Sequence, residues 1–154
     1  MAMFTAAFGA CALAGIASFA ETSWPPVGTD VLTVQQGDRA SYDGERLTLH
    51  NARKTLWFSD RPDRLYGDVS GATYVAAWDE GGTFVSDPPN AVLIGEDGGL
   101  SEPVVMILES AEETEDGFRY LVTMISGDMP DELDLPALFV DAGERNGSYV
   151  GPGG

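Results

Sequence analysis

The chain has 154 residues with 25 acidic and 8 basic side chains, which give a formal net charge of −17. A negative excess of this size argues against nucleic acid and anionic membrane surfaces as partners, because both repel it. With one histidine and one cysteine, the chain also lacks the residues for a multi-histidine zinc site. Its length predicts a single domain.

The first segment, Met1 to Ala20, has no charged side chain, and all the acidic and basic residues follow it. Ser18 and Ala20 are the small residues that flank an A-x-A-like signal peptidase site. We therefore predict a signal peptide over residues 1–20, cleaved before Glu21, and a periplasmic or secreted protein with no membrane insertion after cleavage. A retained anchor and lipidation of Cys11 are the alternatives, and the absence of Lys or Arg near Met1 departs from the usual signal.

Short apolar segments alternate with turn residues through the next part of the chain, which is typical of an all-β domain. The predicted strands are Val31–Gln36, Leu47–His50, Thr55–Ser59, Ala91–Ile94, Val104–Leu108, Phe118–Ile125 and Leu138–Val140. Such a series of short strands predicts an antiparallel β-sandwich or barrel-like domain over residues 21–142. Five glycines in the last twelve residues predict a loose tail over residues 143–154.

One segment has helical rather than β periodicity. Ser70 is a suitable N-cap, Gly81 and Gly82 end the segment, and Tyr74, Val75 and Trp78 share one helical face. We expect one short helix here that covers an open end of the β core.

The middle of the chain carries a distinctive set of motifs. A strand runs into Phe58-Ser59-Asp60-Arg61-Pro62-Asp63-Arg64, the helix with Trp78 follows, and Asp87-Pro88-Pro89-Asn90-Ala91 leads into the next strand. This pattern resembles an uncharacterised family of exported bacterial proteins with F-S-D-R-P-x-R, W and D-P-P-N-A motifs. The resemblance covers the middle third well and the later strands loosely. It implies export and a shared β-rich fold, and it transfers no catalytic residue.

The two motif turns allow a structural and a functional interpretation. Asp, Asn and Pro in such turns satisfy and fix the backbone, so scaffolding explains them. In the functional interpretation, the turns lie at one end of the core and form a ligand pocket. Its predicted residues are Asp60, Arg61, Arg64, Asp87 and Asn90, roofed by Trp57, Tyr66 and Trp78.

Catalytic candidates are few because the reactive residues are scarce. A Ser-His-Asp triad would have to use His50, which follows Leu49 at a strand end, and the chain has no G-x-S-x-G motif. This context favours a structural or solvated histidine. The two acids in Gly95-Glu96-Asp97-Gly98-Gly99 argue against a phosphate-binding loop.

The abundant carboxylates leave two further hypotheses open. A pair of them flanking an aromatic cleft would suit hydrolysis of a polysaccharide or other cell-envelope material. Asp128, Asp131 and Asp134 recur at short intervals and suggest a Ca²⁺ site in a cell-surface structural protein, although the order of an EF-hand is missing. The main hypothesis is a non-enzymatic binding or interaction module without a cofactor, whose partner is a basic protein or a small ligand.

Overall fold

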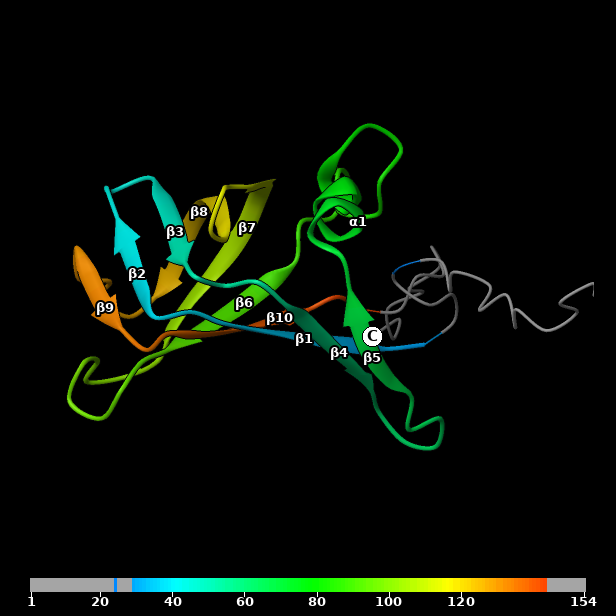
Figure 1. Ribbon diagram of the computed structural model, residues 1–154, viewed down its shortest axis with the longest axis horizontal. Helices are drawn as coiled ribbons and strands as arrows, with labels where there is room; N and C mark the ends of the chain where they lie inside the picture. Colours follow the sequence, from blue (N-terminus) through cyan, green and yellow to red (C-terminus); the bar gives the residue numbers. More distant parts are fainter. Residues whose placement is uncertain (1–23, 25–28, 144–154) are drawn as a thin grey trace, which may run out of the picture.

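The computed structural model describes Trp24 and residues 29–143, which fold into one sheet with a short helical segment on one side (Figure 1). The predicted signal peptide and nearly all of the predicted tail lie outside these residues. The elements are β1 (Val31–Gln36), β2 (Arg39–Tyr42), β3 (Arg46–His50), β4 (Thr55–Ser59), β5 (Tyr66–Val69), α1 (Gly71–Val75), the 3₁₀ helix η1 (Ala76–Trp78), β6 (Asn90–Ile94), β7 (Val104–Glu113), β8 (Phe118–Ser126), β9 (Glu132–Asp134) and β10 (Ala137–Asp141).

All ten described strands belong to one antiparallel sheet in the order β5-β4-β1-β10-β6-β7-β8-β3-β2-β9. The predicted all-β antiparallel fold with one short helix is confirmed, and the sheet does not close into a barrel. Each of the seven predicted strands is present, and β2, β5 and β9 are additional. No helix in the described part of the chain is long and apolar enough to cross a membrane.

A bent pair of strands organises this sheet. β1 continues into β2 and β9 continues into β10, and the two runs stay paired through the bend. The Gly37 N–H donates to the Pro136 carbonyl over 3.2 Å, and the Leu135 N–H donates to the Asp38 carbonyl over 3.0 Å. Leu135 adopts a positive φ of 45° there. The bend separates an extended part (β5, β4, β1, β10 and β6) from a strongly curved part (β7, β8, β3, β2 and β9), as Figure 1 shows.

The helical segment covers one face of the sheet, called the inner face here. The Ser70 side chain caps α1 by accepting the Thr73 N–H over 3.3 Å, as its position predicted. Tyr74 is fully buried and contacts the rings of Trp24, Trp78 and Phe118. Because Trp78 also donates its indole N–H to the Leu108 carbonyl over 2.8 Å, the helical segment is fixed to β7.

The inner face also buries a small polar network. The Tyr120 hydroxyl donates to the Gln35 side-chain carbonyl over 2.5 Å, and Gln35 donates its amide N–H to the Thr55 hydroxyl over 2.8 Å. The Tyr74 hydroxyl is buried beside Tyr120 and Thr33, but it has no hydrogen bond of good geometry. Burial raises the pKa of Tyr74 to about 12 and raises that of Tyr120 well above its ordinary value.

These raised pKa values predict a loss of stability at alkaline pH. An unfolded tyrosine ionises near pH 10, whereas Tyr74 in the fold resists ionisation up to about pH 12. Its contribution is therefore complete below pH 10 and is lost between pH 10 and about 12, by about 3 kcal/mol at most. We expect Tyr74→Phe to change the unfolding free energy by only about 1 kcal/mol at pH 7. Above pH 10, we expect the unfolding free energy of the variant to fall less than that of the parent protein. Urea titrations between pH 7 and 11.5 measure both effects, and an unchanged decline in the variant would contradict the assignment.

Candidate functional site

The two motif turns lie at the same end of the strands, but they do not touch. Asp60 follows β4 and Asn90 begins β6, and β1 and β10 lie between these two strands. Three strand spacings of about 4.8 Å place the turns roughly 14 Å apart. Within the first turn, the Asp60 side chain accepts the Arg61 N–H, and the Asp60 backbone carbonyl accepts the Arg64 N–H. Asp87 is exposed in the second turn.

The three aromatic residues predicted to roof the pocket lie on different faces of the sheet. Trp57 is on the inner face, where its ring contacts Trp24, and Trp24 in turn contacts Tyr74. Trp78 belongs to the same interior group. Tyr66 is 85% exposed and pairs with Phe58, which places it on the opposite, outer face.

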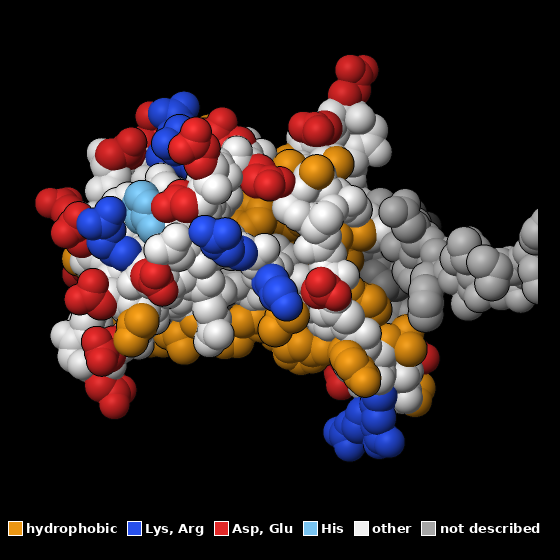
Figure 2. Space-filling model, viewed as in Figure 1, with side chains coloured by type: hydrophobic (Ala, Val, Ile, Leu, Met, Phe, Trp, Pro, Cys, Tyr) orange, Lys and Arg blue, Asp and Glu red, His pale blue; other side chains and the backbone are white. Residues whose placement is uncertain are grey.

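The outer face carries apolar side chains across five neighbouring strands, β4, β1, β10 and β6 of the extended part and β7 next to them. Leu56 pairs with Val34, Val34 with Phe139, Phe139 with Val92, and Val92 with Val105. We call these five residues the apolar row. Phe58 extends the surface at one end and is 45% exposed, while Leu56 is 51% exposed. Figure 2 shows hydrophobic atoms along the lower side of the molecule, away from the helical segment. Strands with apolar residues on both faces are typical of sheets that are covered on both faces.

A hollow of about 360 Å³ adjoins the apolar row at the Asp60 end of β4. Leu32 and Phe58, which pair across β1 and β4, provide apolar lining. The carboxyl groups of Asp30, Asp60 and Asp141 also line it, and none of the three forms an ion pair within the described residues. The hollow therefore combines unpaired negative charge with apolar surface, a combination that suits a cationic group on an apolar stem.

The predicted calcium ligands lie around β9. Asp134 ends β9, and Asp128 and Asp131 precede it, with all three side chains exposed. Within the described residues, no group of three or more acids, histidines or cysteines is arranged to hold a metal ion. The calcium and paired-carboxylate hypotheses stay predictions.

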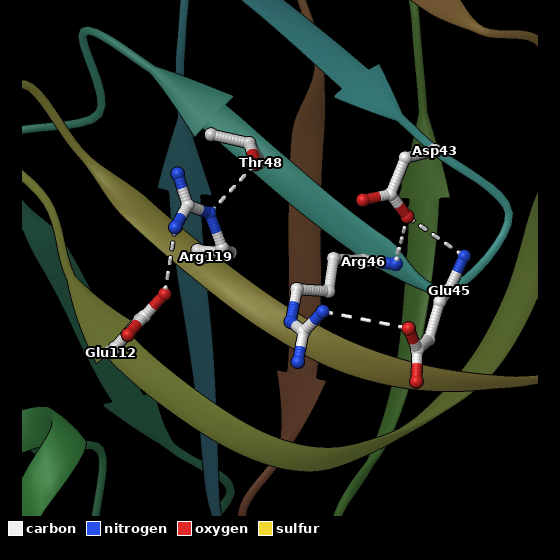
Figure 3. Close-up of polar contacts among 6 residues, drawn as sticks. All are labelled: Asp43, Glu45, Arg46, Thr48, Glu112 and Arg119. Atoms are coloured by element: carbon white, nitrogen blue, oxygen red, sulfur yellow. Dashed lines mark hydrogen bonds and ion pairs between the residues drawn. The ribbon is translucent and has the colours of Figure 1, made fainter.

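A second, polar groove of about 550 Å³ crosses the outer side of β3, β8 and β7. Two arginines lie in it, each next to a glutamate (Figure 3). Arg119 donates to Glu112 over 3.0 Å and to the Thr48 hydroxyl over 3.4 Å, and Arg46 contacts Glu45 at 3.4 Å. Charged and hydroxyl groups of both donor and acceptor type thus line this groove.

Next to this groove, the structure brings together three residues that sequence reasoning did not combine. The Ser41 hydroxyl lies 3.0 Å from Nε2 of His50, and Nδ1 of His50 lies 3.5 Å from the Asp116 carboxylate. Ser41 pairs directly with Thr48, which lines the groove. Sequence reasoning could have identified Ser41 once β2 was recognised. Arg39 pairs with His50, and Ser41 lies two residues further along β2, on the same face.

Electrostatics and two close backbone approaches hold this arrangement. Partial desolvation acts to raise the pKa of Asp116, but hydrogen bonding from Thr114 and the charge of His50 outweigh it and lower that pKa. Gly37 lies so close to the His50 carbonyl that an added Cβ would be 2.5 Å from its oxygen. At Gly117, an added Cβ would clash with the Leu49 carbonyl, so this glycine allows the β7–β8 turn to approach the end of β3.

No protein family matches the sequence, and no curated protein or solved structure shows significant similarity to it. The resemblance to the exported bacterial family therefore stays a prediction.

The contact at Gly117 predicts a specific effect of a small substitution. Gly117→Ala places a methyl group against the backbone carbonyl of Leu49, which cannot move without disturbing β3. We expect an unfolding free energy lower by about 1–3 kcal/mol and loss of the contact between His50 and Asp116. Urea denaturation measures the first effect, and the histidine ring signals in NMR spectra report the second. Ala111→Gly is the control, since it removes a methyl group from the adjoining strand without adding one at the turn.

Proposed function

We propose that this protein is an exported binding module whose outer face holds a basic protein partner. The observation that carries the proposal is the partly exposed apolar row, in which Leu56 is 51% exposed, next to the acidic hollow. An apolar surface of this kind on an otherwise charged protein is typical of an interaction site. The sheet supplies it as a rigid platform, because backbone pairing fixes every one of its strands.

Charge selects the class of partner. The net charge of −17 attracts a basic protein from a distance and raises its association rate. At close range, Asp30, Asp60 and Asp141 surround an apolar lining to which the stem of a Lys or Arg side chain fits. The basic side chains of Arg61 and Arg64 lie in the β4–β5 turn at the rim of this surface, so they bound the docking area rather than fill it.

A labelled peptide of alternating Lys and Leu residues tests the proposal, with a Glu-Leu peptide as its counterpart. We expect the Lys-Leu peptide alone to bind, and we expect Phe58→Ser to weaken binding at least about 10-fold, since Phe58 joins the apolar row to the hollow and aromatic side chains contribute much of the affinity at interfaces. Fluorescence anisotropy measures both affinities. Val85→Ser is the matched control, because Val85 is 55% exposed in the segment between η1 and β6, outside the docking surface.

A second comparison separates the hollow from the overall charge. Asp30→Asn with Asp141→Asn removes two charges at the hollow, and Glu80→Gln with Glu102→Gln removes two elsewhere. We expect the first pair to weaken binding clearly more than the second. Equal losses in the two pairs would show that only net charge attracts the peptide. Equal affinities of Phe58→Ser and Val85→Ser would contradict docking on the outer face.

A further inference from the structure

A different surface of the molecule supports an activity that does not rest on the proposed binding function. Ser41 on β2, His50 at the end of β3 and Asp116 in the β7–β8 turn lie on the outer side of the curved part of the sheet. A short turn separates the strands of Ser41 and His50, and Asp116 comes from a segment much later in the sequence. Their order of contact is hydroxyl, imidazole, carboxylate, with the serine at one ring nitrogen of His50 and the aspartate at the other.

We propose that Ser41, His50 and Asp116 form a hydrolytic triad that cleaves acyl esters of polyhydroxylated, sugar-like alcohols. The roles follow from which atoms face each other. Nε2 of His50, at 3.0 Å from the Ser41 hydroxyl, accepts its proton, while Asp116 holds the proton on Nδ1 and stabilises the imidazolium. The side chain of His50 is 26% exposed, so the pair is open to a substrate arriving from solvent.

The reaction proceeds in two balanced steps. The Ser41 oxygen attacks the ester carbonyl carbon and gives its proton to His50, the bond from that carbon to the alcohol oxygen breaks, and His50 passes the proton to the departing alcohol. Water then attacks the acyl-serine carbon and gives a proton to His50. The bond to the serine oxygen breaks, the acid leaves, and the proton returns to Ser41.

A neighbouring hydroxyl is placed to stabilise the negative charge on the carbonyl oxygen. Thr48 lies directly across from Ser41 in the β2–β3 pair, and its oxygen accepts an N–H from Arg119 over 3.4 Å. A hydroxyl group can accept one hydrogen bond and donate another, so Thr48 can donate its hydrogen to a substrate while it accepts from Arg119. A donor aimed at the developing oxyanion is usually worth several kcal/mol in rate.

The groove next to Thr48 indicates the alcohol part of the substrate. Its arginines, glutamate and aspartate provide donors and acceptors side by side over about 550 Å³. This mixture suits hydroxyl groups, which donate and accept, better than a ligand of one charge or an apolar chain. The lining residues that supply these groups are Asp43, Arg46, Thr48, Ser110, Glu112 and Arg119.

Covalent labelling tests the nucleophile directly. A fluorophosphonate probe reacts with an activated serine, and we expect mass spectrometry of the digested protein to find it on Ser41. With p-nitrophenyl acetate, we expect Ser41→Ala and His50→Gln each to lower kcat at least about 100-fold. Ser126→Ala is the control, because Ser126 is an exposed strand serine away from the groove. Labelling at no site, or full activity of Ser41→Ala, would overturn the triad.

Two further measurements keep the proposal independent of folding defects. Ser41→Cys preserves the size of the side chain, and we expect it to melt within a few degrees of the parent protein while losing fluorophosphonate labelling. Asp116 acts through His50, so we expect Asp116→Asn to lower kcat with little change in KM. Asp63→Asn is its charge-matched control. A rise in KM alone would assign Asp116 a merely structural role and contradict the triad.

The substrate class has its own test. We expect release of acetate from fully acetylated glucose, with the release reduced by Arg119→Gln more than hydrolysis of p-nitrophenyl acetate is. Hydrolysis of p-nitrophenyl acetate without any release of acetate from the sugar would retain the triad and overturn the sugar-ester assignment. Because Phe58→Ser leaves this region intact, its effect on peptide binding is independent of either result.

Discussion

The bend shared by β1–β2 and β9–β10 is the constraint on which the rest of the structure depends. Two antiparallel strands change direction together only if their hydrogen bonds continue through the bend, and the bonds between Gly37, Asp38, Leu135 and Pro136 provide this continuity. The bend gives the two parts of one sheet different environments. The extended part presents apolar side chains to solvent, and the curved part presents hydroxyl and charged groups.

The same bend connects core packing with the polar surface chemistry. Gly37 lies against the His50 carbonyl and Gly117 against the Leu49 carbonyl, so two backbone contacts fix both sides of the end of β3. Leu49 is fully buried beneath this point. The position of His50 is thus determined by packing that a surface substitution does not easily alter, which is the kind of rigid support that a catalytic group needs.

The sequence predicted the architecture better than the sites. Alternation of apolar residues identified strands such as Val31–Gln36, because one of their faces is buried. It missed β2, β5 and β9, since Arg39–Tyr42 has few apolar residues, Tyr66–Val69 contains Gly67 and Asp68, and Glu132–Asp134 is acidic. The predicted strand ended at Leu108, yet β7 extends through Glu113, because Ser110 to Glu113 pair with β8 beyond a register shift at Glu109.

Site residues were harder to predict because they depend on strand order. The motif turns do share one end of the sheet, but β1 and β10 separate them, and the sequence does not reveal that insertion. Face assignment of Tyr66 required its pairing with Phe58. His50 was recognised as a strand-end histidine, but its neighbours Ser41 and Asp116 come from an unpredicted strand and from a turn whose position was set by a close glycine contact.

The two edge strands also limit how copies of this protein meet. β5 has four residues and includes Gly67 and Asp68, while β9 has three and carries Glu132 and Asp134. Short edges with charged side chains resist the addition of a foreign strand, because a new neighbour would lie against carboxylates and gain few backbone hydrogen bonds. The ten-stranded sheet is therefore protected against growth into a fibril, even though one of its faces exposes apolar side chains.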